Sequence, residues 1–283
     1  MHVALATCSG LPDLDADSAL LPPALHALGV ATTVAVWDDP AVDWAAYDLV
    51  VVRSTWDYVP RRAEFLGWAA TVPRLANPAH VLTWNTDKTY LRELAAAGIP
   101  VVPTTYLAPG QAYERPGVEH VVKPTVSVGA QDTERFGPDG DGSALVARLH
   151  AQGRTAMVQP YLEGVEADGE TAVVMVAGEL SHAARKAPLL APGAAPYTYD
   201  DTEVMSPREP TVAQVDLARA VLAAAPGPLL YARVDVVPGP DGSPVLLELE
   251  ATEPSLFLRQ TPTLRPGPDA AAALAMAVRA LLD

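Results

Sequence analysis

The first eighty residues alternate between short apolar runs and longer stretches with helical spacing. Apolar runs at HVALAT (2–7), TTVAVW (32–37) and DLVVVRS (48–54) predict buried strands. Residues 18–29 and 61–72 have the spacing of helices. Strand–helix–strand units of this size predict a parallel sheet with right-handed crossovers. Such a sheet binds ligands at the carboxyl ends of its strands, here the loops CSGLPD and STWDY.

A second pattern begins at Asn85. NTDKTYLRELAAAG (85–98) has a polar start, an apolar stripe and a glycine stop, which predicts one helix. It is followed by a predicted strand HVVKP (120–124), a helix over 143–152 and a strand TAMVQPY (155–161).

The last part of the chain mixes strands, helices and one stretch without a clear pattern. The predicted elements are strands at 170–176 and 179–186, an irregular stretch over 187–208, a helix over 210–224, a hairpin over 231–250 and a helix over 269–282.

Composition narrows the class of protein. The chain has 283 residues, enough for two or three compact units, and its net charge is −15. This charge argues against binding to nucleic-acid phosphates or to an anionic membrane surface, although it leaves room for a nucleotide. One cysteine, Cys8, rules out an internal disulfide and fits a reducing compartment. No signal peptide or membrane-length apolar segment is visible, so we expect a soluble cytoplasmic protein.

Common short motifs are absent. No GxGxxG follows the first strand, and no GxxxxGK[ST], GxSxG or HExxH occurs. DGDGS at Asp139 resembles the start of a calcium loop, but Ala144 and His150 replace the required glycine and glutamate, so a solvated turn is favoured. For Cys8, a small buried or loop residue is favoured over a nucleophile.

The predicted hairpin carries an unusual set of charges. If Val236 pairs with Val245, Arg233 faces Glu248 and Asp235 faces Leu246. Strand alternation then predicts two faces. Arg233, Asp235, Glu248 and Glu250 share one face, while Val234, Val236, Leu247 and Leu249 point into the core.

Three carboxylates on one face repel one another, and a single arginine cannot balance them. Mg²⁺ can, because it accepts a few carboxylate oxygens and completes its octahedron with phosphate and water. The alternative is an exposed strand face with ordinary surface charges, and the hairpin alone leaves both interpretations open.

Two lysines favour an anion-binding cleft. Lys88 lies in the first turn of the predicted helix, and Lys123 ends an apolar strand before Pro124. Lysine at such a strand end is explained by an anion within reach of its ammonium. The alternatives are a surface residue for Lys88 and a solvent-reaching side chain for Lys123. TVSVGAQDT (125–133) suits a flap over phosphates, and MVQPYLE (157–163) a hinge beside a base.

Taken in this order, these segments resemble the ATP-grasp superfamily of carboxylate ligases, in the branch of glutathione synthetase and D-alanine–D-alanine ligase. The resemblance covers nearly the whole chain. It implies an α/β protein with the ATP-grasp fold and an N-terminal parallel-sheet domain over residues 1–84. A lid subdomain with the phosphate lysines would follow over 85–160, and a subdomain with the metal-binding hairpin over 161–283.

The resemblance also implies roles for individual residues. Lys88 and Lys123 would contact ATP phosphates, Gln159, Tyr161 and Leu162 would form the adenine hinge, and Glu170 would accept the ribose hydroxyls. Asp235, Glu248 and Glu250 would bind two Mg²⁺ ions. Arg233, with Lys123, would be catalytic, beside the transferred phosphate. A substrate carboxylate would attack the γ-phosphate to form an acylphosphate, which an amine then converts to an amide.

Within the superfamily, LATCSGLPDLDADSALL, VVVRSTWDYVPRR and TEPSLF look most like the O-ureido-serine cyclo-ligases of D-cycloserine biosynthesis. This implies a small amino-acid-like substrate and ring closure by the substrate's own ureido nitrogen. Ordinary loop structure is the alternative for each of the candidate substrate contacts, which are Ser9, Arg53, Ser54, Thr55, Asp57, Arg185, Lys186 and Ser255. A homodimer is left open.

The chain departs from many relatives at three places. Glu250 stands where many carry asparagine, the flap at 125–133 has one glycine, and ATEPSLF replaces a TSPG-like run beside the acceptor site. The competing interpretations are an intermolecular amino acid or peptide ligase, a non-catalytic nucleotide-binding regulator, and a small-molecule kinase.

Overall fold

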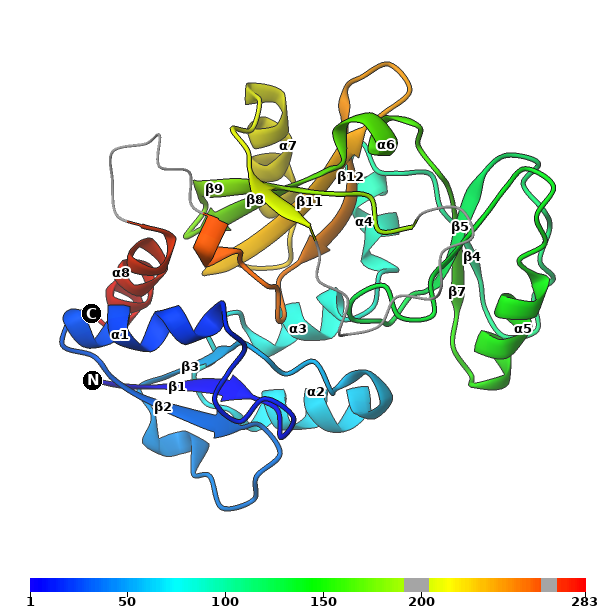
Figure 1. The fold of residues 1–283 in the computed structure, drawn as a ribbon. Helices are drawn as coiled ribbons and strands as arrows, with labels where there is room; N and C mark the ends of the chain where they lie inside the picture. The colour runs from blue at the N-terminus through cyan, green and yellow to red at the C-terminus, as the bar shows by residue number, and fades with distance from the viewer. Residues whose placement is uncertain (191–203, 261–268) are drawn as a thin grey trace.

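The computed structural model describes residues 1–190, 204–260 and 269–283, which form three sheets (Figure 1). The N-terminal sheet has the order β2-β1-β3, with β1 (His2–Thr7) parallel to β2 (Ala31–Val36) and β3 (Leu49–Val52). The predicted parallel α/β arrangement is thus confirmed. Its helices are α1 (Leu21–Ala27) and α2 (Arg62–Thr71), with 3-10 turns at Ser18–Leu20, Trp44–Ala46 and Val59–Arg61.

The middle sheet carries the segment expected to cover phosphates. It has the order β4-β7-β5-β6 and is antiparallel throughout. Its strands are β4 (Thr105–Leu107), β5 (His120–Pro124), β6 (Glu134–Phe136) and β7 (Ala156–Pro160). Leu145 and Leu149 of α5 (Ser143–Ala151) pack onto Val122 and Val158 of this sheet. In Figure 1 the sheet and α5 lie at the right.

The single helix predicted over 85–98 is wrong. The chain forms α3 (Ala79–Asn85) and α4 (Tyr90–Ala96), and Lys88 lies in the turn between them. The turn is stabilised because Asp87 Oδ1 accepts the Thr89 N–H at 3.0 Å and the Lys88 N–H donates to Thr125 O at 2.8 Å. The lysine is therefore fixed beside the flap rather than on a helix surface.

The third sheet is the largest and has the order β10-β9-β8-β11-β12. The strands β8 (Glu170–Val176), β9 (Glu179–Lys186), β11 (Tyr231–Pro238) and β12 (Pro244–Glu250) match the predicted ones, while β10 (Met205–Pro207) lies in the stretch predicted as irregular. Residues 191–203 of that stretch lie outside the described residues. The short α6 (Gly164–Asp168) precedes β8, and α7 (Val212–Ala223) begins at a capping box of Thr211 and Gln214.

The register of the hairpin differs from the predicted one. Val237 pairs with Val245 and Val236 with Leu246, but beyond a β-bulge Asp235 pairs with Glu248 and Arg233 with Glu250. Leu247 is the extra residue, so Leu246 rather than Leu247 enters the core. The bulge restores the alternation, and all four charged residues still share one face.

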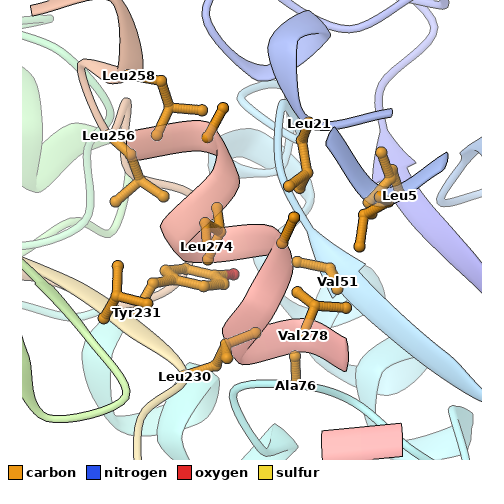
Figure 2. Packing of buried hydrophobic residues seen from close by; sticks show 14 of the residues in the cluster. Leu5, Leu21, Val51, Ala76, Leu230, Tyr231, Leu256, Leu258, Leu274 and Val278 are labelled. Atoms are coloured by element: carbon orange, nitrogen blue, oxygen red, sulfur yellow. The ribbon is translucent and has the colours of Figure 1, made fainter. Parts of the chain in front are cut away.

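Helix α8 (Ala270–Leu282) joins the N-terminal sheet to the third sheet. Leu274 and Val278 are fully buried between Leu21 and Val51 on one side and Tyr231 on the other (Figure 2). A short 3-10 turn, Leu258–Gln260, lies near this helix. In the described parts of the chain, no helix is long and apolar enough to cross a membrane.

Candidate active site

A cavity of about 500 Å³ is bordered by side chains from the middle and third sheets and from loops of the N-terminal part, such as Trp56 and Tyr58. This size suits a small-molecule ligand. Its charged lining includes Lys123 of β5, Lys186 of β9, Asp235 of β11 and Glu248 of β12. Residues separated by more than a hundred positions therefore converge here, including both lysines predicted to bind phosphate.

Arg233 organises the acids of the hairpin. Its Nε donates to Asp235 Oδ1 at 2.8 Å and its Nη2 to Asp235 Oδ2 at 3.0 Å, and the guanidinium also pairs with Glu250. Lys186 Nζ lies 3.2 Å from Asp235 Oδ2. Burial alone would raise the pKa of Asp235, but Arg233 and Lys186 hold it below its usual value. Asp235 is therefore an anion at neutral pH.

Lys88 and Lys123 lie beside Glu248 of the same hairpin. Lys88 Nζ lies 3.1 Å from Glu248 Oε1 and donates to both the carbonyl and the hydroxyl oxygen of Ser127, each at 3.0 Å. Burial lowers the pKa of Lys123, although Glu248 opposes this shift. Burial would raise the pKa of Glu248, but Lys88 and Lys123 keep it lowered. Lys88 thus connects the flap to the charged hairpin.

Glu250 is the least neutralised acid of the hairpin. Burial, with Glu248 and Asp235 nearby, raises its pKa to about 8 despite Arg233. Among the described residues, no three His, Cys, Asp or Glu side chains are arranged as a ready metal site. The acids pair instead with arginine and lysine. The donor chemistry nevertheless fits a hard cation, because Asp235, Glu248 and Glu250 supply oxygen atoms and their mutual repulsion would be offset by positive charge.

The residues of the predicted adenine hinge also line the cavity. Gln159, Tyr161 and Leu162 all border it, together with the apolar Val102 and Val165. Gln159 Nε2 donates to Thr104 Oγ1 at 2.9 Å, which orients the buried amide. Arg135 lies 3.4 Å from the centre of the Tyr161 ring. The apolar side chains of Val102, Leu162 and Val165 in this part of the lining suit a purine.

Glu170 lies at the start of β8 and also borders the cavity. Its Oε2 is 3.1 Å from Lys186 Nζ, so this lysine connects Glu170 to Asp235.

Most of the predicted substrate contacts do not border the cavity in the described structure; Lys186 and Ser255 do. Arg53 is 1% exposed and donates to Pro254 O at 2.6 Å. Ser54 donates to Asp15 at 2.6 Å, and Asp57 accepts from Trp37 Nε1 at 2.9 Å and pairs with Arg61.

The other three candidates are distributed over the surface and the core. Ser9 is exposed in the loop after β1, Thr55 is fully buried, and Arg185 Nε donates to Asp168 O at 2.7 Å. The hydrogen bonds of Arg53, Ser54, Asp57 and Arg185 connect parts of the chain to one another.

Sequence reasoning missed several residues that border the cavity, among them Asp17, Trp56, Tyr58 and Glu253. Burial raises the pKa of Glu253 to about 7, and the Tyr58 hydroxyl interacts with its carboxylate. The signal for Glu253 was a further acid three residues beyond the charged hairpin, in the loop that closes the site. Nothing in the sequence pairs Tyr58 with it, since the two lie almost two hundred positions apart.

Comparison with known proteins agrees with this geometry. Residues 3–77 match the family model described as "D-cycloserine synthetase DcsG, N-terminal domain". The "Cycloserine biosynthesis protein DcsG" of Streptomyces lavendulae is 37% identical over 277 residues, covering 90% of this chain and 92% of that protein. The chain belongs to the DcsG family of ATP-grasp ligases.

Solved structures share the fold of this chain. A crystal structure of D-cycloserine synthetase DcsG matches with a TM-score of 0.88 and 35% identity, covering 100% of both chains. The D-alanine–D-alanine ligase of Bacillus anthracis complexed with ATP gives a TM-score of 0.68 at 16% identity, covering 99% of this chain and 96% of that chain. The predicted ATP-grasp fold is confirmed, and the chain is a ligase.

Proposed function

We propose that this ligase activates the carboxylate of an O-ureido-serine-like substrate as an acylphosphate and closes it to D-cycloserine. The observation that carries the proposal is the convergence of Lys88, Lys123, Arg233 and the three hairpin acids at one cavity. The similarity to DcsG over the whole chain supports the substrate class. The domain division at residues 84 and 160, a cytoplasmic location and a homodimer remain predictions.

Different parts of the cavity lining would bind the adenine, the ribose and the phosphates of ATP. The apolar part at Tyr161 and Leu162 would hold the adenine, with Glu170 at the ribose. Lys88 and Lys123 would contact the phosphates, which requires Lys88 to exchange its bonds to Ser127 for phosphate oxygens. Asp235, Glu248 and Glu250 would hold two Mg²⁺ ions. When bound, these ions supply charge neutralisation at the phosphates.

The reaction needs no protein nucleophile. The substrate carboxylate oxygen attacks the γ-phosphorus, and ADP leaves with the bonding electrons. Arg233, fixed by Asp235 and the Ser255 carbonyl, would stabilise the negative charge on the transferred group. The ureido nitrogen then attacks the acyl carbon, loses its proton and expels phosphate. Hydrolysis of the remaining carbamoyl group to carbon dioxide and ammonia gives cycloserine.

Incubation with ATP, Mg²⁺ and O-ureidoserine, without any added amine, tests this function. We expect one ADP per cyclic product, identified by mass spectrometry. ADP release that depends on an added free amine would instead identify an intermolecular ligase. A stable phosphorylated product would identify a kinase.

A further inference from the structure

The acids that border the cavity fall into two groups. Glu170, Asp235, Glu248 and Glu250 each form an ion pair with a lysine or Arg233. Asp17 and Glu253 form none with the residues that the structure describes, although both border the cavity. The Arg259 N–H donates to Asp17 Oδ1 at 3.2 Å, so Glu253 is the one of the two that we consider for a ligand. A carboxylate in this position is costly unless a positive group reaches it. Glu253 interacts with the Tyr58 hydroxyl but forms no ion pair with the described residues, which points to a cationic part of the ligand.

The main chain around Glu253 is held independently of its carboxylate. Trp56 Nε1 donates to Glu253 O at 3.0 Å, Arg53 Nη2 to Pro254 O at 2.6 Å, and Tyr231 Oη to Thr252 O at 3.0 Å. These bonds hold the loop after β12 against the segment after β3 and against β11. The Glu253 side chain has no part in these three bonds, so it can bind a ligand without releasing the loop.

The same loop extends to the predicted carboxylate end of the site. Arg233 Nη1 donates to Ser255 O at 2.9 Å, only two residues beyond Glu253. Two residues of chain span at most about 7 Å. The main chain of Glu253 therefore lies near the Arg233 guanidinium, and both side chains border the same cavity. A positive and a negative group in one cavity suit a zwitterion, whose carboxylate and ammonium groups are attached to the same carbon.

We propose that the Glu253 carboxylate binds the ammonium group of the substrate and so selects an amino acid over a plain carboxylic acid. This inference rests on the proposed function, since it assumes that the substrate carboxylate is activated beside Arg233. Tyr58, whose hydroxyl interacts with Glu253, borders the same cavity. Glu253 is then a specificity-determining residue in a loop that otherwise serves to close the site.

Binding measurements with a non-hydrolysable ATP analogue and Mg²⁺ test this role. Two ligands are compared by calorimetry: O-ureidoserine and its analogue with hydrogen in place of the amino group. Wild-type enzyme should bind the amino compound about 100-fold more tightly. Glu253→Gln should lose most of this preference while its affinity for the analogue stays within about threefold. Glu253→Asp should keep part of the preference.

Two controls separate folding from recognition. Each variant must bind the ATP analogue as wild type does, and Glu114→Gln, at an exposed acid outside the cavity, should change neither affinity. Equal loss for both ligands in Glu253→Gln, an unchanged preference, or no preference in wild type would overturn the inference. Failure of the proposed function appears differently, as an absent cyclic product from a wild-type enzyme that still distinguishes the two ligands.

Discussion

Two segments that contribute to the cavity lining each contain a buried arginine, and the two arginines bond different kinds of partner. In the hairpin, Arg233 bonds Asp235 and Glu250, whose carboxylates face the cavity. In the segment after β3, Arg53 bonds the Ser18 hydroxyl and Pro254 O, and its guanidinium lies 5.1 Å from the centre of the Tyr231 ring.

This difference shows that the partner decides the role of a buried charge. A carboxylate that borders a cavity can give up its ion pair with arginine and bind a ligand or a metal instead. A main-chain carbonyl buried between two parts of the chain has no such second partner. Arg233 is therefore placed to act on a ligand. Arg53 instead joins the N-terminal sheet to the loop after β12, as the hydrogen bond to Pro254 indicates.

The largest expected effect is the loss of turnover in Glu248→Gln. The substitution removes one negative oxygen from the hairpin and from the pair with Lys88, and it leaves the shape unchanged. We expect ADP formation to fall by at least about 100-fold, because charge stabilisation of phosphoryl transfer is lost. Coupled ADP assays measure the rate, and circular dichroism checks the fold. Turnover at the wild-type rate would remove Glu248 from the mechanism.

Arg53→Met should act mainly on stability. It removes two hydrogen bonds from a side chain that is 1% exposed and leaves Pro254 O without its donor. We expect the free energy of unfolding to fall by about 2–3 kcal/mol in urea titrations. Affinity for the ATP analogue should stay near that of wild type, because Arg53 does not border the cavity. Weakened nucleotide binding at unchanged stability would make Arg53 a ligand contact after all.

The pH dependence of stability tests the contribution of His182, which bonds the loop after β12 at a third point. Its Nε2 donates to Leu256 O at 2.8 Å, and burial lowers its pKa below 6.5. The unfolded chain then binds the proton more readily, so this contribution to stability is present above about pH 6.5 and is lost as the pH falls through the folded pKa. Unfolding curves at pH 7.5 and 5.5 should differ less in His182→Asn than in wild type. An equal difference in both proteins would assign the pH dependence to other groups.

Asp57→Asn should have the smallest effect. Asp57 accepts from Trp37 and pairs with Arg61, whose side chain is 35% exposed. Such partly exposed pairs contribute about 0–1 kcal/mol, so the melting temperature should change little. The KM for the substrate should also stay constant, because the aspartate is outside the cavity. A large rise in KM would return Asp57 to the substrate site.

Much of the fold was predictable, because apolar runs between clear turns determine long strands. The strands at 120–124, 170–176 and 179–186 begin and end where the sequence indicates. The break between α3 and α4 was not predictable, since the Asn85 side chain bonds Leu249 O and the Ala251 N–H, far away in sequence. Short strands such as β4 and β6 likewise depend on their partners in the sheet.

The candidate site was predictable to the extent that charge stands out against apolar strands. Lys123, Asp235 and Glu248 interrupt such strands, and the structure brings them to one cavity. Their roles toward ATP and metal stay predictions. Loop residues carried no comparable signal, because a polar side chain in a loop bonds main chain as readily as ligand. Arg53 and Asp57 were therefore predicted as contacts, while Tyr58 and Glu253 were missed.

The edge of the largest sheet has a consequence beyond the site. β12 is its outermost strand, and the Tyr90 hydroxyl both donates to Leu249 O and accepts from the Leu249 N–H, at 2.9 and 2.8 Å. The Val102 N–H donates to Leu246 O at 2.9 Å, and the Leu246 N–H donates to Pro100 O at 2.8 Å. These contacts occupy groups that would otherwise pair with a strand from another molecule. The segment from Tyr90 to Val102 thus protects the chain from edge-to-edge aggregation along β12.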